Sequence, residues 1–128
     1  MKFWLALTFL VSPAAAEPCA GVDRTLDEAE RPGLVALVAR QLEVRGVTVR
    51  ASLRSGAWRA LLVTARDMDE SYVFWSADPQ TQRFVEAIGS FALPAGEAAT
   101  TRWLVENVSG IPTSLAACVA GLTAAAAR

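Results

Sequence analysis

One short run of oxygen-bearing side chains has spacings that could coordinate calcium. Asp67, Asp69 and Ser71 occupy the first, third and fifth positions of a loop whose twelfth position is Asp78. A calcium loop of this kind needs glycine at its sixth position, where the chain turns sharply, and that residue here is Tyr72. We therefore interpret the run as a polar turn, and we predict neither a metal ion nor a cofactor.

A second group of acidic side chains could support acid–base chemistry. The chain has no histidine, which is the most frequent general base and metal ligand, so Ser–His–Asp and Cys–His sites are excluded. Catalysis by carboxylates alone would need Asp69, Glu70 and Glu86 to meet in one cleft. A solvated acidic surface explains these residues more simply. We expect a protein that is not an enzyme, and a carboxylate-dependent hydrolase is the alternative.

Three arginines could together bind an anion. Arg50, Arg54 and Arg59 fall on two neighbouring predicted strands, and converging guanidinium groups can grip a carboxylate or a phosphate. Charged residues that point outward are, however, ordinary on strands. We prefer that second interpretation.

The start of the chain has the three-part pattern of a cleavable signal peptide. Lys2 gives a positive start, residues 3–11 are apolar, and Ala14 and Ala16 place small residues before Glu17. The apolar run is shorter than the roughly 20 residues needed to span a bilayer. We predict a signal peptide over residues 1–16, cleavage after Ala16, and a periplasmic or secreted protein without a membrane span.

The composition favours one domain and no strongly charged partner. The formal net charge is −1, and loss of Lys2, the sole lysine, lowers it to −2. A value so close to neutral gives no field that would attract nucleic acid. Glu17 and Pro18 stand where a lipid-attachment motif ending at Cys19 would need small residues, so no lipid anchor is expected. Residues 17–128 are enough for a single ordinary core.

The two cysteines, Cys19 and Cys118, can pair in only one way. An even number of cysteines in an exported protein indicates a disulfide bond. A redox-active pair would more often be spaced as Cys-x-x-Cys. We therefore predict a structural disulfide that joins the N-terminal segment to the last helix.

Hydrophobic periodicity predicts a helix, then antiparallel strands, then two more helices. Residues 82–91 fit either a strand or a helix, and we favour a fourth strand because Gly89 would weaken a helix interior. The expected elements are a helix from Pro32 that stops by Gly46, strands at 47–54, 58–66 and 71–75, a strand within 82–91, and helices at 97–108 and 112–124.

The predicted fold is an α+β, two-layer single domain. It has an N-terminal helix, a three- to four-stranded antiparallel meander, and two C-terminal helices packed on one sheet face. A turn at Ser55-Gly56 would pair Leu53 with Trp58. The same register pairs Ala51 with Ala60 and Val49 with Leu62, and would place all six residues on the core face.

The opposite sheet face is the candidate binding surface. It is expected to hold an apolar, partly aromatic patch flanked by arginines, unless the segment 18–26 covers it. The residues are Arg50, Arg59, Leu61 and Val63, joined by Tyr72 and Phe74 or by Val73 and Trp75. We expect a small exported, non-enzymatic binding or accessory protein whose partner is another periplasmic protein or a second copy of itself; the other alternative is a carrier of a small apolar ligand.

Overall fold

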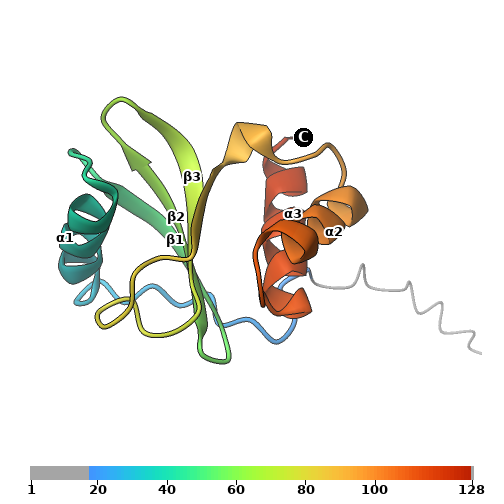
Figure 1. The fold of residues 1–128 in the computed structure, drawn as a ribbon, viewed down its shortest axis with the longest axis horizontal. Coiled ribbons are helices and arrows are strands. Elements are labelled where there is room, and N and C mark those ends of the chain that lie inside the picture. The colour runs from blue at the N-terminus through green and yellow to red at the C-terminus, as the bar shows by residue number, and fades with distance from the viewer. Residues whose placement is uncertain (1–17, 128) are drawn as a thin grey trace, which may run out of the picture.

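The computed structural model describes residues 18–127, which form three α-helices, a short 3₁₀ helix and four strands (Figure 1). The predicted signal peptide and its cleavage site lie outside the described residues. In chain order the elements are α1 (Arg31–Leu42), β1 (Thr48–Ser55), β2 (Trp58–Ala65), β3 (Met68–Trp75), β4 (Glu86–Gly89), the 3₁₀ helix η1 (Ser90–Ala92), α2 (Glu97–Asn107) and α3 (Thr113–Ala126).

The strands form one antiparallel sheet in the order β1-β2-β3-β4. Helices α2 and α3 pack together on one face of it, which confirms the α+β single domain with its C-terminal helices on the sheet. The structure adds a third layer, because α1 covers the opposite face (Figure 1). The two-layer expectation is corrected for a physical reason: β2 and β3 carry apolar side chains on both faces, and each face needs a cover.

Each face of the sheet has its own hydrophobic core. The C-terminal core, between the sheet and helices α2 and α3, consists of Cys19, Leu53, Ala60, Tyr72, Phe74, Ile88, Leu104, Val108, Ile111, Leu115, Ala116, Cys118 and Val119. The α1 core, between the sheet and α1, consists of Leu34, Leu37, Val38, Val49, Leu61, Val63, Val73 and Trp75.

The β1–β2 hairpin differs from the predicted register by two residues. Its turn is Gly56-Ala57, so that Leu53 pairs with Ala60 and Ala51 with Leu62. Gly56 has a φ of 58°, which glycine adopts without strain and which suits the first position of a two-residue hairpin loop. A shift of two keeps these four residues on their predicted face, because side chains alternate with period two.

Val49 lies on the opposite face of the sheet from Leu53, so the prediction that it shares the face of Leu53 was wrong. The register shifts between Val49 and Ala51, which leaves Arg50 as a β-bulge. A bulge adds one residue to the strand, so the side chains beyond it point to the opposite face from the one that simple alternation predicts. Val49 consequently pairs with Val63 and belongs to the α1 core.

Two residues in the left-handed region set element boundaries that the sequence misplaced. Glu43, with φ 55°, ends α1 at Leu42, before the expected Gly46. Asp67, with φ 60°, closes the turn between Ala65 and Met68, so β3 begins at Met68 rather than at Ser71. Aspartate tolerates this conformation better than most residues.

The fourth strand is confirmed as Glu86–Gly89. The long loop before it is held to α1 by hydrogen bonds of the Gln41 side chain. The amide nitrogen of Gln41 donates to the carbonyls of Pro79 and Gln82 at 3.1 and 3.0 Å. Its amide oxygen accepts from the indole N–H of Trp75 at 3.1 Å and from the backbone N–H of Phe84 at 2.9 Å. Gln41 thus satisfies polar groups that the loop cannot satisfy itself.

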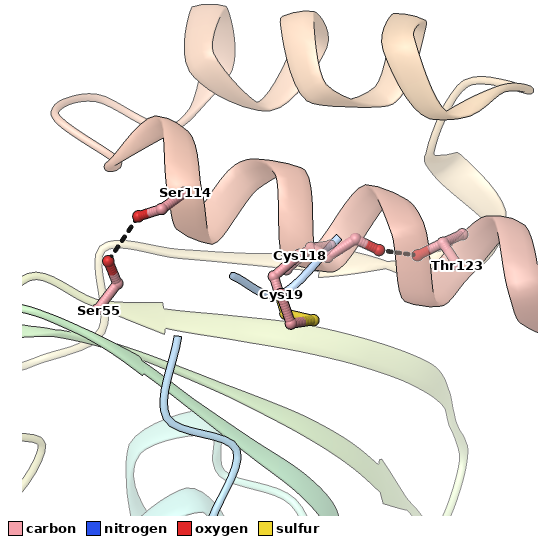
Figure 2. Close-up of a disulfide and its surroundings, with 6 residues drawn as sticks. Cys19, Ser55, Ser114, Cys118 and Thr123 are labelled. Carbon is pink, nitrogen blue, oxygen red and sulfur yellow. Dashed lines mark hydrogen bonds between the residues drawn. A yellow bond between two sulfur atoms is a disulfide. The ribbon is translucent and has the colours of Figure 1, made fainter. Parts of the chain in front are cut away.

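The predicted disulfide is confirmed: Cys19 and Cys118 are joined by an S–S bond of 2.05 Å, between α3 and the sheet (Figure 2). Gly121, one turn further along α3, permits the close approach, because a Cβ there would lie 2.1 Å from Pro18 Cβ. Near the start of the helix, the hydroxyls of Ser55 and Ser114 are 2.7 Å apart and link β1 to α3 (Figure 2). Within residues 18–127, the helices are all too short or too polar to cross a membrane.

Candidate functional site

The residues predicted to form one binding face are divided between the two faces of the sheet. Leu61, Val63 and Trp75 lie in the α1 core and are fully buried beneath that helix. Tyr72 and Phe74 alternate with Trp75 along β3 and are buried in the C-terminal core. The second sheet face is therefore covered by α1, and Leu26, at the end of the N-terminal segment, packs against the same core.

Of the residues predicted to form the binding face of the sheet, Arg50 is the one whose side chain is exposed. Its Nη1 lies 3.6 Å from the carboxylate of Glu70, and the Arg50 side chain is 57% exposed. Exposed pairs of this kind contribute little to stability. Glu86 Oε1 accepts from the backbone N–H of Ala87 at 3.2 Å. Among residues 18–127, no three acidic or cysteine side chains are grouped closely enough to hold a metal ion.

Arg59 is the centre of a polar cluster at the edge of the α1 core. Its Nε and Nη2 donate to Ser52 Oγ at 3.1 and 2.9 Å, and its Nη1 donates to Glu30 Oε1 at 2.6 Å. Glu30 also accepts two bonds from Arg54 Nη2, at 3.0 and 3.2 Å. The Arg59 side chain is only 8% exposed, and a buried guanidinium needs such partners because unpaired buried charge is costly.

A polar hollow of about 470 Å³ opens beside this cluster. Trp58 and Asp78 line it together with Glu30, Arg54 and Arg59. The two arginines are brought together as an anion site would require, but the carboxylate between them is the chain's own Glu30. The cluster therefore acts as a structural link between the sheet and the residue that precedes α1.

Glu30 makes stability depend on pH. The hydrogen bond from Arg59, with the charges of Arg59 and Arg54, holds the pKa of Glu30 below its ordinary value of 4.5, and burial opposes part of this. A lowered pKa stabilises the fold above the unfolded value, and the benefit is lost as the pH falls through the folded value. The free-energy difference between the wild type and Glu30→Gln, from urea unfolding, should be constant above pH 4.5 and shrink below it. A difference that grows on acidification would contradict this assignment.

Two hollows lie where the C-terminal end of α3 meets the sheet and the segment that follows β4. The sheet-side hollow, of about 210 Å³, is lined by Arg24, Ala51, Leu62, Glu70, Tyr72, Ser90, Leu122, Thr123 and Ala126. The loop-side hollow, of about 290 Å³, is lined by Ser90, Leu93, Pro94, Ala95, Gly96, Thr100, Ala120, Thr123, Ala124 and Ala127. The two share Ser90 and Thr123, and most of their lining is apolar.

The polar side chains in the lining are hydroxyls, apart from Arg24 and Glu70 in the wall of the sheet-side hollow. Burial raises the pKa of the Tyr72 phenol above its ordinary 10.0, and a hydrogen bond with the Thr123 side chain opposes part of the rise. Tyr72 is therefore uncharged at neutral pH. Thr123 Oγ1 also bonds the carbonyl of Val119, at 2.8 Å (Figure 2). Thr100 Oγ1 bonds the carbonyls of Pro94 and Gly96, each at 2.8 Å.

Ser90, shared by both hollows, has a hydroxyl that is not satisfied. Its Oγ is buried and has no hydrogen-bond partner among residues 18–127. Buried polar atoms without a partner are rare in folded proteins, and each one calls for an explanation. Ser90 begins η1, whose single turn is closed by a 3.3 Å bond from the Leu93 N–H to the Ser90 carbonyl.

Replacing Ser90 with alanine should not destabilise the protein. Removing a buried hydroxyl that makes no bond relieves its desolvation cost, so the free energy of unfolding should rise by about 1 kcal/mol. Ser55→Ala is the matched control, because it removes a hydroxyl that is bonded to Ser114 and should lower stability by about 1 kcal/mol. Chemical denaturation of both variants measures the two effects. A larger loss for Ser90→Ala than for Ser55→Ala would show that Ser90 is bonded in the native state.

Sequence reasoning missed Ser90 and the hollows around it. The alternative of a small apolar ligand carried between sheet and helices concerns the same region, and of the lining residues Glu70 and Tyr72 were singled out as candidate site residues. A serine after a short strand belongs to no periodic pattern, and whether its hydroxyl finds a partner depends on residues distant in the chain.

Comparison with protein-family models, with curated proteins and with solved structures finds no match, so any function must be inferred from this chain's own residues.

Proposed function

We propose that residues 17–128 form a small exported protein that acts by binding a small, largely apolar molecule rather than by catalysis. Export follows from the signal-peptide pattern, with cleavage after Ala16. The Cys19–Cys118 bond supports an oxidising compartment, because structural disulfides persist in the periplasm and outside the cell.

The pair of hollows around Ser90 is the observation that carries this proposal. Ligand sites in proteins are mostly apolar concavities with a few polar groups. The sheet-side hollow supplies Leu62 and Leu122, and the loop-side hollow supplies Leu93 and four alanines. The polar cluster around Arg59 has the opposite character, because its charged groups already bond one another.

Native mass spectrometry of protein purified from its own host tests the proposal. We expect the unfolded polypeptide to begin at Glu17, and the folded protein to carry an additional small mass that disappears on denaturation. Protein that has been unfolded, extracted and refolded is the control and should show the bare mass. The same bare mass in freshly purified and in refolded protein would contradict the proposal.

A protein partner is the second candidate, and one side chain favours it. Phe91, in η1, is 79% exposed, which is unusual for a large aromatic residue and is typical of residues that anchor protein interfaces. Phe91→Asp separates the two functions: it should leave the small-molecule mass unchanged and should abolish capture of a partner by a cross-linker placed at the neighbouring exposed Ala92.

A further inference from the structure

We infer that the two hollows form one site for a single uncharged amphiphile, whose polar group bonds Ser90 and whose apolar parts occupy the space on either side. The inference rests on the proposed binding function and names the ligand's chemistry. Three observations lead to it: the size of the hollows, the character of their lining and the unpartnered hydroxyl between them.

The volumes of the two hollows indicate that together they form one binding site. Small-molecule sites usually measure roughly 300–1,000 Å³, and the hollows of about 210 and 290 Å³ are each below that range. Taken together they fall within it. Because Ser90 and Thr123 line both, a ligand that passes these two residues can occupy the whole space.

The lining indicates an uncharged ligand. The loop-side hollow has no charged side chain in its wall. The sheet-side hollow has two charged side chains in its wall, and both are engaged: Glu70 is paired with Arg50, and Arg24 interacts with other groups of the chain. Tyr72 is neutral. An ionic group placed next to Ser90 would lose its hydration, and the charged side chains of the sheet-side wall already interact within the chain, so the exchange is unfavourable.

The Ser90 hydroxyl supplies the polar contact. A hydroxyl both donates and accepts a hydrogen bond, so it suits an alcohol, an ester or an amide. Its Oγ is shielded in the structure, and rotation about the Cα–Cβ bond moves it to other staggered positions. The ligand's polar group would satisfy an atom that has no partner among residues 18–127.

Alanines on the last turn of α3 allow a direct test. Ala124 lines the loop-side hollow, Ala126 lines the sheet-side hollow, and Ala125 between them lines neither. Ala124→Phe and Ala126→Phe fill one hollow each, whereas Ala125→Phe places the same ring on the exposed side at the same cost in helix propensity. The probe is 1-octanol, and octanoate is the charged control with a chain of the same length.

Amide chemical shifts in NMR titrations of residues 17–128, with the disulfide intact, report both binding and folding. We expect wild type and Ala125→Phe to bind 1-octanol at least tenfold more tightly than octanoate. Both filling variants should lose octanol affinity at least tenfold, and Ser90→Ala should lose it about three- to tenfold, as for one neutral hydrogen bond. The spectra must show each variant folded.

The measurements distinguish failure of this inference from failure of the proposed function. If wild type retains its native ligand, or binds either probe, but all three site variants bind like Ala125→Phe, the ligand lies elsewhere and the inference is overturned. If Ser90→Ala alone behaves like wild type, or if octanoate binds as tightly as octanol, the assigned ligand chemistry is wrong. If wild type binds neither probe and purifies without a ligand, both proposals fail.

Discussion

Replacing both cysteines with alanine is expected to lower the free energy of unfolding by about 4.7 kcal/mol, the value for a closed loop of roughly 100 residues. Cys19 and Cys118 are separated by 99 positions, and the bond restricts the unfolded chain over nearly the whole described structure. A domain of this size is commonly stable by about 5–15 kcal/mol, so the loss would be a large part of the total. Urea denaturation of the Cys19→Ala/Cys118→Ala variant against oxidised wild type gives the difference.

Alanine is the better replacement because serine would add a second effect. Cys118 is fully buried and Cys19 is 4% exposed, so two serine hydroxyls would lie unsatisfied in the C-terminal core. Reduced wild type is a second control, since it keeps both sulfur atoms in place. A loss below about 1 kcal/mol would show that the unfolded chain is already compact enough for the bond to matter little.

Removing the Glu30 carboxylate is expected to lower the free energy of unfolding by about 3 kcal/mol, the low end for breaking a buried ion pair. In Glu30→Ala, the Arg59 guanidinium stays buried but loses its carboxylate partner. Of the two side chains that accept its hydrogen bonds in the wild type, Ser52 remains. The loss arises mainly from that stranded charge. The low end applies because the Glu30 side chain is itself 30% exposed. Thermal or urea unfolding at pH 7 measures it.

Glu28 provides a matched control two residues away. Its carboxylate pairs with Arg31 at 2.9 Å, but the Glu28 side chain is 79% exposed. Solvent and salt screen such a pair, so Glu28→Ala should change stability little. The double variant Glu30→Ala/Arg59→Leu should recover most of the loss, because an apolar side chain replaces the stranded charge. If Glu28→Ala and Glu30→Ala lowered the free energy of unfolding equally, burial of the Arg59–Glu30 pair would not be the cause of the loss.

The hollows around Ser90 and the cluster around Arg59 illustrate different uses of polar atoms. In the cluster, each charged group meets an opposite charge or a hydroxyl, and little is left to offer an outside molecule. At Ser90, a hydroxyl is buried beside apolar space without a partner in the described part of the chain, residues 18–127. The second arrangement is expected to lower the stability of the free protein, and it leaves a hydroxyl that the proposed ligand would bond.

The order and type of the elements could be determined from the sequence because these depend on local patterns. Period-two alternation predicts β1, and the turn after it predicts β2 as the return strand. The stripe at Leu115, Cys118 and Val119 defines the inner side of α3, and two cysteines allow a single pairing. Even the wrong turn in the first hairpin left the faces of Leu53 and Ala60 correct. A shift of two residues preserves alternation.

Tertiary structure alone decided which surfaces are closed and which groups meet. One extra residue at Arg50 moved Val49 to the other core, and docking of α1 covered the face that the sequence left open. Gln41 bonds a loop that begins more than thirty residues later. The buried hydroxyl of Ser90 has no partner among residues 18–127, and residues of α3 line the hollows beside it. Periodicity describes which side of an element is apolar, whereas these contacts depend on which distant element packs against that side.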